Sequence, residues 1–241
     1  MRHNIPLLLL FLLGLFATAC SSLTPPTLKS GLRVLLVPAT GTGTPTPAAL
    51  RVTEAILSER LAAFGFKNAS VQELTSGSQP TLQVEVPHFG GDERATLDTL
   101  LNTGMLEFWN TGPSLVPIGS TFTPSQFAQY NPGGKAPFTG NDLDGSQVSV
   151  GTDQAGRPDI LFEMKGGAIA KFGNFTQQNI GNYLTITLND KVIESAVIQS
   201  AISGQGQLTG NFTLQHAAAI ASVLKYPSLP VVLHIMSESS F

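Results

Sequence analysis

The residues whose types and spacing come closest to a chemical site are two carboxylates, Asp142 and Asp144. They lie in Asn-Asp-Leu-Asp-Gly at 141–145, and oxygen ligands in such a loop are what calcium prefers. The glutamate that closes an EF-hand loop is missing. A turn held by hydrogen bonds to the aspartate side chains explains the same segment at least as well. We therefore expect a turn, with a calcium loop as the alternative.

The other candidate catalytic groups are scattered along the chain. The four histidines are His3, His88, His216 and His234, and no two of them stand at a metal-ligand spacing such as i, i+4. His216, on an expected helix, and His234, on an expected strand, favour structural roles. No serine occupies a Gly-x-Ser-x-Gly turn. The residue pattern predicts no catalytic centre, no metal site and no cofactor.

Two glycine-rich segments, 41–43 and 204–207, look like phosphate-binding loops at first sight. Neither has the Lys-Ser/Thr ending of a P-loop, and neither fits a strand-loop-helix dinucleotide fingerprint. Turn geometry is the better explanation, because Gly206 and Gly210 supply backbone freedom where Leu208 must point inward.

Residues 1–19 are expected to be a lipoprotein signal peptide rather than part of the fold. The apolar run at 7–13 is shorter than the roughly 20 residues of a membrane span, but it suits a signal peptide. Small residues at 17–19 precede Cys20, the only cysteine, whose thiol is the expected lipid attachment site. An ordinary secretory signal is the alternative. Residues 20–30 would be a tether, and a lipid anchor would hold the protein on the extracytoplasmic side of a bacterial membrane.

Charge is sparse in this chain. Charged residues make up 12% of it, against roughly 25% in an average globular protein. The formal net charge is −3, and lysine and arginine form no cluster. These features exclude a protein that binds nucleic acid through its phosphate backbone. They also exclude a basic patch for anionic lipid headgroups.

The first half of the chain alternates strand and helix patterns. Residues 48–64 are the most convincing helix, because Pro47 suits its first turn, Gly65 suits its end, and apolar residues recur at helical spacing. Those apolar residues are Val52, Ile56, Leu57, Leu61 and Phe64. Strands are expected at 32–37, 69–74, 81–86 and 105–109, and a second helix at 92–101. The resulting β-α-β-β-α-β order is that of ferredoxin-like folds.

The second half is loop-rich from 110 to 140 and regular again beyond it. Residues 123–126 form a capping-box pattern that starts a short helix. Thr176 and Thr213 each follow Asn-Phe and precede a helical stretch, so both are expected to be N-caps. The other expected elements are strands at 147–151, 159–164, 183–188, 191–195 and 231–235, and helices at 174–181 and 213–224. The last strand is expected to return to the first half.

Segment 172–231 carries a resemblance to a known family. It contains Phe-Gly-Asn-Phe-Thr-Gln-Gln-Asn-Ile-Gly at 172–181, Leu-Asn-Asp-Lys-Val at 188–192, Gly-Gln-Gly-Gln-Leu-Thr-Gly-Asn-Phe-Thr at 204–213 and Leu-Pro-Val at 229–231. This order of pieces resembles the large extracytoplasmic head-and-base domain of SecD, the protein-export subunit that works beside the Sec translocon. The similarity extends more weakly back to Leu32.

The resemblance implies an α+β fold in which a ferredoxin-like base carries an inserted α+β head. The base is expected at 31–110, the head at 111–226, and a strand returning to the base at 227–241. Hinges between head and base are expected at Gly112, Pro113, Tyr226 and Pro227.

The resemblance also implies a binding site. A SecD-like head is expected to hold an extended, unfolded polypeptide against apolar side chains, with an exposed sheet edge for backbone pairing. The expected contact residues are Phe162, Phe172, Phe175 and Phe212, and the alternative is that each is buried packing. The later membrane helices that hold the family's proton-relay residues are missing from this sequence, so energy-coupled pulling by this chain alone is not expected.

Two functions follow as hypotheses. The favoured one is a lipid-anchored, non-enzymatic accessory of protein export that passively holds translocating polypeptides, with Sec translocon subunits as candidate partners. The alternative is a structural or envelope-assembly lipoprotein that kept the fold and lost substrate binding. An enzyme is the least favoured class, and a bound metal or cofactor in purified protein would revive it.

Overall fold

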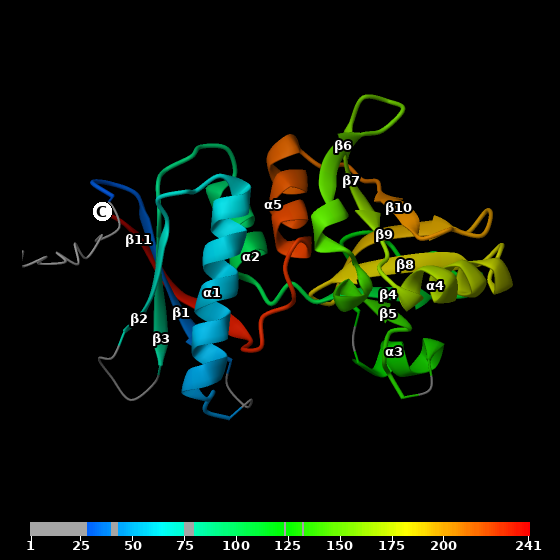
Figure 1. Cartoon of the computed structure of the whole chain (residues 1–241), viewed down its shortest axis with the longest axis horizontal. Helices are drawn as coiled ribbons and strands as arrows, with labels where there is room; N and C mark the ends of the chain where they lie inside the picture. The colour runs from blue at the N-terminus through cyan, green and yellow to red at the C-terminus, as the bar shows by residue number, and fades with distance from the viewer. Residues whose placement is uncertain (1–27, 40–42, 75–79, 123, 132) are drawn as a thin grey trace, which may run out of the picture.

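The computed structural model describes residues 28–39, 43–74, 80–122, 124–131 and 133–241. These residues form two lobes that meet along one helix (Figure 1). The predicted signal peptide, the lipid attachment site Cys20 and most of the predicted tether lie outside the described residues, as does Thr123 of the capping box.

One lobe, the base lobe, is an antiparallel sheet with helices on one face (Figure 1). The strand order is β11-β1-β3-β2, and every pair is antiparallel. Its elements are β1 (Leu32–Pro38), α1 (Pro47–Phe64), β2 (Ser70–Leu74), β3 (Thr81–Val86), α2 (Glu93–Leu101) and β11 (Leu233–Ser240). Buried and half-exposed residues alternate along β3, so one face of the sheet lies against the core.

Local capping signals explain where α1 begins and ends. The Thr46 side chain accepts a hydrogen bond from the Ala49 N–H (3.2 Å), and Pro47 occupies the first turn. Gly65 ends the helix with a φ of 123°, a conformation that favours glycine. The predicted start, length and end of this helix are confirmed. Val52 is the exception among its predicted apolar residues, because it is 50% exposed rather than on the buried face.

The predicted return of the last strand is confirmed, because β11 pairs with β1. The strand predicted at 105–109 exists, but its assignment to the base sheet is wrong. Residues 106–110 form β4 (Leu106–Asn110), which pairs with β8 in the other lobe. Phe108 and Trp109 on β4 are fully buried there. Phe108 therefore belongs to the main core of the other lobe and Trp109 to a small cluster with Phe122 and Val192, while β11 occupies the edge of the base sheet beside β1.

The other lobe, the head lobe, contains two small sheets around a shared core. Their strand orders are β5-β4-β8-β9 and β10-β7-β6. Besides β4, its elements are α3 (Pro124–Tyr130), β5 (Phe138–Thr139), β6 (Ser149–Thr152), β7 (Pro158–Glu163), α4 (Gly167–Gln178), β8 (Tyr183–Leu188), β9 (Lys191–Val197) and β10 (Gln205–Leu208), with 3-10 turns η1 (Gly140–Asp142) and η2 (Gly145–Gln147). The α+β class predicted from the sequence is confirmed.

Helix α4 differs from the predicted helix at 174–181. It begins at Gly167, after Gly166, which has a φ of 52° and offers no side-chain cap. Thr176 lies inside the helix and is fully buried, so its prediction as an N-cap was wrong. Its hydroxyl donates to the Phe172 carbonyl oxygen (2.8 Å) and accepts from the Ile202 N–H (2.9 Å). This threonine joins the helix to a distant loop instead of starting the helix.

Strand β10 was missed because residues 204–207 were interpreted as a turn. Gly206 pairs with Phe162 on β7. A Cβ atom at Gly206 would lie 2.2 Å from Cζ of Phe162, so glycine is needed to make room for the ring. The inward orientation of Leu208 is confirmed, since this residue is fully buried.

Helix α5 (Leu214–Leu224) lies between the lobes and contributes to both cores (Figure 1). Thr213 is confirmed as its N-cap, accepting a hydrogen bond from the His216 N–H at 3.1 Å. The helix packs against α1 and α2 on one side and against β6 and β7 on the other. Ala219 belongs to the base core, whereas Ile220 and Val223 belong to the head core. Hydrophobic contact through α5 therefore couples the lobes.

Candidate functional site: the junction between the lobes

The chain leaves the base lobe after α2 and returns to it after α5. We call residues 102–105 the first crossing and residues 225–229 the second crossing. The Leu229 N–H donates to the Thr103 carbonyl oxygen at 2.8 Å, so the two crossings are bonded to each other. Any relative movement of the lobes must act on these two segments.

Arg60, on α1, holds both crossings from the base side. Its guanidinium donates to the carbonyl oxygens of Asn102 (2.7 Å), Thr103 (3.0 Å) and Pro227 (3.0 Å). The side chain is fully buried, and the ion pairs in the described part of the chain do not include it. Burial lowers the pKa of Arg60 to about 10, so the group stays charged at neutral pH. A buried charge is thus compensated by backbone carbonyl groups from two segments.

Asn189, in the β8–β9 turn, holds the first crossing from the head side. Its Oδ1 accepts hydrogen bonds from the N–H groups of Gly104 (2.8 Å) and Met105 (3.0 Å). Its own N–H donates to the Met105 carbonyl oxygen (2.8 Å). Asn189 has a φ of 51°, a left-handed conformation that asparagine tolerates better than most residues. The first crossing therefore lies between a base arginine and a head asparagine.

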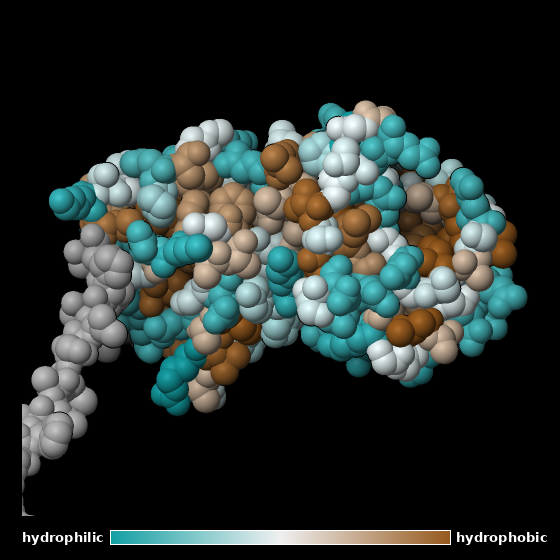
Figure 2. Space-filling model, turned by 45° about the horizontal axis from the view of Figure 1, so that its top comes forward, coloured by the Kyte–Doolittle hydropathy of each residue, from teal (hydrophilic) through white to brown (hydrophobic). Residues whose placement is uncertain are grey.

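A cleft of about 470 Å³, the interlobe cleft, opens at this junction. Its walls come from α2, from the β8–β9 turn and residues 118–119, and from the start of α5. Its larger apolar side chains are Ile118, Leu188, Val192, Ile193, Phe212 and Ile220. On the face drawn in Figure 2, hydrophobic residues (brown) are exposed where the lobes meet. A volume of roughly 300–1,000 Å³ with largely apolar walls is typical of ligand sites.

Three ionisable groups line the cleft, and Lys191 is one that the ion pairs of the described residues do not include. Asp98 pairs with Arg94, with Nε and Oδ1 3.2 Å apart. Burial lowers the pKa of His216, the positive charge of Lys191 lowers it further, and the carboxylate of Asp92 opposes them. The imidazole is therefore neutral at neutral pH. The larger part of the wall is apolar and suits apolar segments, with Lys191 as the charged group at its edge.

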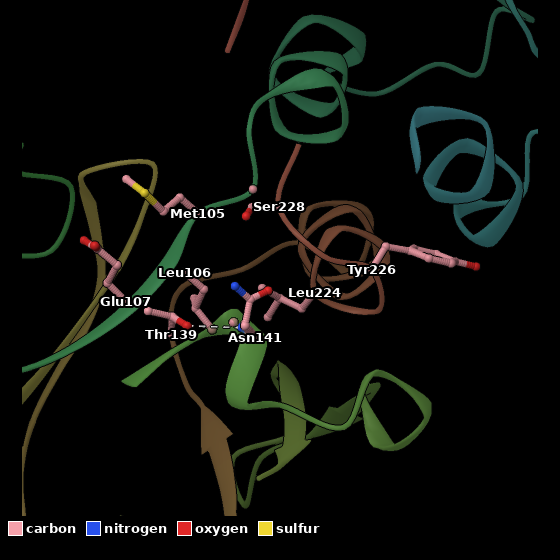
Figure 3. A pocket seen from close by; sticks show the side chains of 10 residues that line it. Met105, Leu106, Glu107, Thr139, Asn141, Leu224, Tyr226 and Ser228 are labelled. Carbon is pink, nitrogen blue, oxygen red and sulfur yellow. Dashed lines mark hydrogen bonds between the residues drawn. The ribbon is translucent and has the colours of Figure 1, made fainter. Parts of the chain in front are cut away.

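A second, smaller cavity of about 160 Å³ also touches both crossings (Figure 3). Leu106 and Glu107 line it from β4, Thr139 and Asn141 from the β5–η1 region. Figure 3 shows the Tyr226 ring directed away from the other lining side chains, and its hydroxyl donates to Glu59 on α1 (3.4 Å). This cavity is too small for an extended chain, so the interlobe cleft is the better candidate site.

The four phenylalanines predicted to contact polypeptide lie in different places. Phe162 and Phe172 are buried in the head core. Phe175 is half-buried and packs on the Phe172 ring. Phe212 lines the interlobe cleft, where its ring lies edge-on to His216 at a centroid distance of 5.7 Å. Of the four, the structure brings Phe212 alone to this cleft.

Two of the four predicted hinge residues lie at the junction between the lobes, and two do not. Tyr226 and Pro227 lie in the second crossing, and Pro227 is bonded to Arg60. Gly112 and Pro113 follow β4 within the head lobe. The Gly112 carbonyl oxygen accepts from the Tyr183 N–H at 2.7 Å, which holds this segment to β8. The chain leaves the base lobe earlier, at residues 102–105.

Sequence reasoning missed Arg60 and Asn189. A signal for Arg60 was available, because it follows Leu57 by three residues and so lies on the buried face of α1 with Thr53 and Leu61. An arginine at such a position is rarely buried without a specific partner. Asn189 carried a weaker signal as a turn residue between two expected strands.

The carboxylates Asp142 and Asp144 both cap short turns. Asp142 accepts from the Thr139 N–H (2.8 Å), and Asp144 accepts from the Ser146 N–H (3.0 Å). These are the hydrogen bonds of the turn interpretation. In the described ranges, no three His, Cys, Asp or Glu side chains gather in a way that could hold a metal ion.

The fold and the junction define a class of protein: a two-lobed α+β domain with a ligand-sized cleft between its lobes. Residues 123–231 match the family model described as SecDF, P1 head subdomain. The chain is 50% identical over 105 residues to the protein translocase subunit SecD of Aquifex aeolicus, a match covering 43% of this chain and 21% of that protein. With SecD of Dictyoglomus turgidum it shares 29% identity over 213 residues, covering 88% and 47%.

Solved structures agree with these matches. SecDF in a super-membrane-facing form gives a TM-score of 0.63 at 28% identity, covering 87% of this chain and 30% of that one. A structure described as a membrane component SecDF that enhances protein export gives 0.60 at 27%, covering 85% and 98%. These findings confirm the resemblance to the SecD family. The chain spans between about a fifth and a half of these curated relatives. Within the described ranges, no helix is both long and apolar enough to cross a bilayer.

Proposed function

We propose that this protein is a lipid-anchored, SecD-like accessory of protein export that passively binds translocating polypeptides outside the cytoplasmic membrane. The similarity to the protein translocase subunit SecD supports the export role. The interlobe cleft supports the binding role, because it combines apolar walls with a volume suited to a few side chains. Cys20 is the proposed lipid attachment site, and Sec translocon subunits are the proposed partners.

Binding in such a cleft depends on burial of apolar surface. Fully burying one large apolar side chain contributes about 1.5–3 kcal/mol, while association and ordering of a flexible chain cost several kcal/mol. A cleft that takes only a few side chains therefore binds weakly and releases quickly. Weak, sequence-tolerant binding is what holding a moving polypeptide requires.

Side-chain contact is favoured over pairing with a sheet edge at this site. β9, the edge strand beside the cleft, is covered at its start by residues 119–121. The Gly119 N–H donates to the Val192 carbonyl oxygen (2.8 Å), and the Val192 N–H donates to the Ser120 carbonyl oxygen (2.9 Å). The edge that the resemblance led us to expect is thus occupied at the cleft, whereas the Phe212 ring lies in its wall.

A photo-crosslinking residue in place of Phe212 tests the binding role. We expect adducts with a polypeptide arrested during export. The matched control carries the same crosslinker at Ala155, an exposed residue of the β6–β7 turn that does not line the cleft. Equal, background-level adducts at both positions would favour the alternative of a structural envelope lipoprotein.

The anchor has a separate test. Cys20→Ser is expected to release the protein from the membrane fraction and to remove the mass of the acyl chains from the mature protein. Unchanged fractionation and mass would contradict lipid attachment at Cys20, without bearing on the cleft. Co-purification from detergent, with and without the anchor, shows whether translocon subunits accompany the protein.

A further inference from the structure

Arg60 is placed to do more than fill the core. Its guanidinium reaches three carbonyl oxygens, two from the first crossing and one from the second. The planar fork of an arginine can bond several acceptors in fixed directions, which a lysine cannot do. Because the segments lie more than a hundred residues apart in sequence, one side chain ties the exit from the base lobe to the return into it.

Neighbouring residues leave room for the Arg60 guanidinium and bond the same two crossings. Gly104 has a φ of 76°, and a Cβ atom at that position would lie 2.4 Å from Nη2 of Arg60, so the glycine leaves room for the guanidinium. The Leu229 N–H bonds to the Thr103 carbonyl oxygen, which Arg60 also contacts. On the head side, Asn189 bonds Gly104 and Met105. Both crossings are thus fixed by hydrogen bonds, although they are the segments through which the lobes would move.

We propose that Arg60 is a positioning residue that fixes the relative orientation of the lobes and thereby the width of the interlobe cleft. The cleft is lined by α2 from the base lobe and by the β8–β9 turn from the head lobe. The first crossing follows α2 directly and is hydrogen-bonded to Asn189 in that turn. Loss of the Arg60 hydrogen bonds frees the crossings, and the two walls then move relative to each other. The consequence for polypeptide binding rests on the proposed function, whereas the effect on orientation does not.

The test is a distance measurement between the lobes in the absence of any polypeptide. In the full chain carrying Cys20→Ser, spin labels are attached to cysteines at Ala55 on α1 and Gln177 on α4, both exposed. We expect one narrow distance distribution with Arg60 in place. With Arg60→Gln the distribution should become at least twice as broad or shift, and with Arg60→Lys the change should be intermediate. A folded Arg60→Gln protein with an unchanged distribution would overturn the proposal.

If Arg60→Gln does not fold, Arg60→Lys decides the test, and an unchanged distribution in that folded variant would overturn the proposal. A second pair of variants tests the head-side hydrogen bonds of the same crossing. Asn189→Gly preserves the left-handed backbone but removes the acceptor for Gly104 and Met105, whereas Asn189→Asp retains an acceptor. We expect broadening with Asn189→Gly and not with Asn189→Asp, and equal distributions for both would show that the head-side hydrogen bonds do not contribute to the orientation. Circular dichroism and Trp109 fluorescence report folding.

If an unfolded polypeptide fails to bind the unmodified chain, the proposed function fails while the distances still decide the role of Arg60.

Discussion

The base lobe and the head lobe differ in how their cores are organised. The base core is mainly aliphatic, and its rings, Phe64, Phe66 and Phe89, gather in one cluster. In the head core the rings are central: Phe172 contacts both Phe108 and Phe138, at centroid distances of 5.7 and 5.1 Å. The base is one sheet with its helices, whereas the head has two small sheets, joined where the Phe108 ring of β4 packs against the Phe162 ring of β7 at a centroid distance of 5.6 Å. The helices of the base are specified largely by local patterns, whereas the core of the head depends on contacts between rings that are distant in sequence.

Large-to-small substitutions in the two cores give the largest expected effect. Phe172→Ala in the head should lower the free energy of unfolding by about 3–5 kcal/mol, and Leu57→Ala in the base by about 2–5 kcal/mol, because both side chains are fully buried. Since α5 belongs to both cores, each variant should still unfold in one cooperative transition. Urea unfolding followed by Trp109 fluorescence, which reports on the head, and by far-UV circular dichroism checks this.

The control for that comparison is Val52→Ala on α1. Val52 is 50% exposed, so its truncation should change stability by no more than about 0.5 kcal/mol. If the fluorescence and dichroism curves separate in either core variant, the lobes unfold independently. The coupling assigned to α5 would then be wrong.

The threonines of the two Asn-Phe-Thr triplets, Thr176 and Thr213, should differ in how much their substitution lowers stability, and both effects are smaller than those of the core variants. Thr176→Val keeps the shape of the side chain but leaves the half-buried Ile202 N–H without its acceptor, which should cost about 1–3 kcal/mol. Thr213→Ala removes an exposed N-cap and should cost about 1 kcal/mol. Thr213→Ser should restore most of the second loss, while Thr176→Ser should retain the bond to Ile202. Equal behaviour of the two sites in thermal unfolding would contradict their different roles.

The pH dependence linked to His216 is the smallest expected effect. The folded protein holds the pKa of His216 below its usual value of about 6.5, so protonation favours the unfolded state. The full contribution to stability is therefore present above pH 6.5 and is lost as the pH falls below it. Between pH 7.5 and 5 the protein should therefore lose more stability than His216→Asn, by a small amount because the imidazole is partly exposed to solvent. Parallel stability curves for the two proteins between pH 7.5 and 5 would argue against it.

The same difference between the lobes explains what the sequence could predict. In the base, Pro47 and Gly65 bound a helix whose apolar residues repeat, so α1 could be predicted from neighbours along the chain. In the head, α4 begins at Gly167 without a capping side chain, and β10 contains a glycine required by the ring of Phe162. Such causes lie in residues distant in sequence. β4 was assigned to the wrong lobe for the same reason, because strand pairing is a long-range contact.

The candidate site was only partly predictable. Phe212 was selected for its aromatic side chain and does line the interlobe cleft, but the same criterion selected Phe162 and Phe172, which the core buries. Composition cannot distinguish a ring that faces a cleft from one that fills a core. The burial of Arg60 could be predicted from its place on α1, but its partners could not, because segments 102–105 and 225–229 are distant in sequence.

The most direct test of the central claim is the affinity of the purified protein for a fluorescently labelled, permanently unfolded polypeptide, measured by fluorescence anisotropy. The matched variants are Phe212→Asp in the interlobe cleft and Ile180→Asp, which changes an apolar residue 54% exposed outside that cleft. A charge buried in the cleft should weaken binding by about tenfold or more, equivalent to about 1.4 kcal/mol. The account predicts this loss for Phe212→Asp and near-normal affinity for Ile180→Asp. Equal affinity of both variants and the unmodified protein would contradict it.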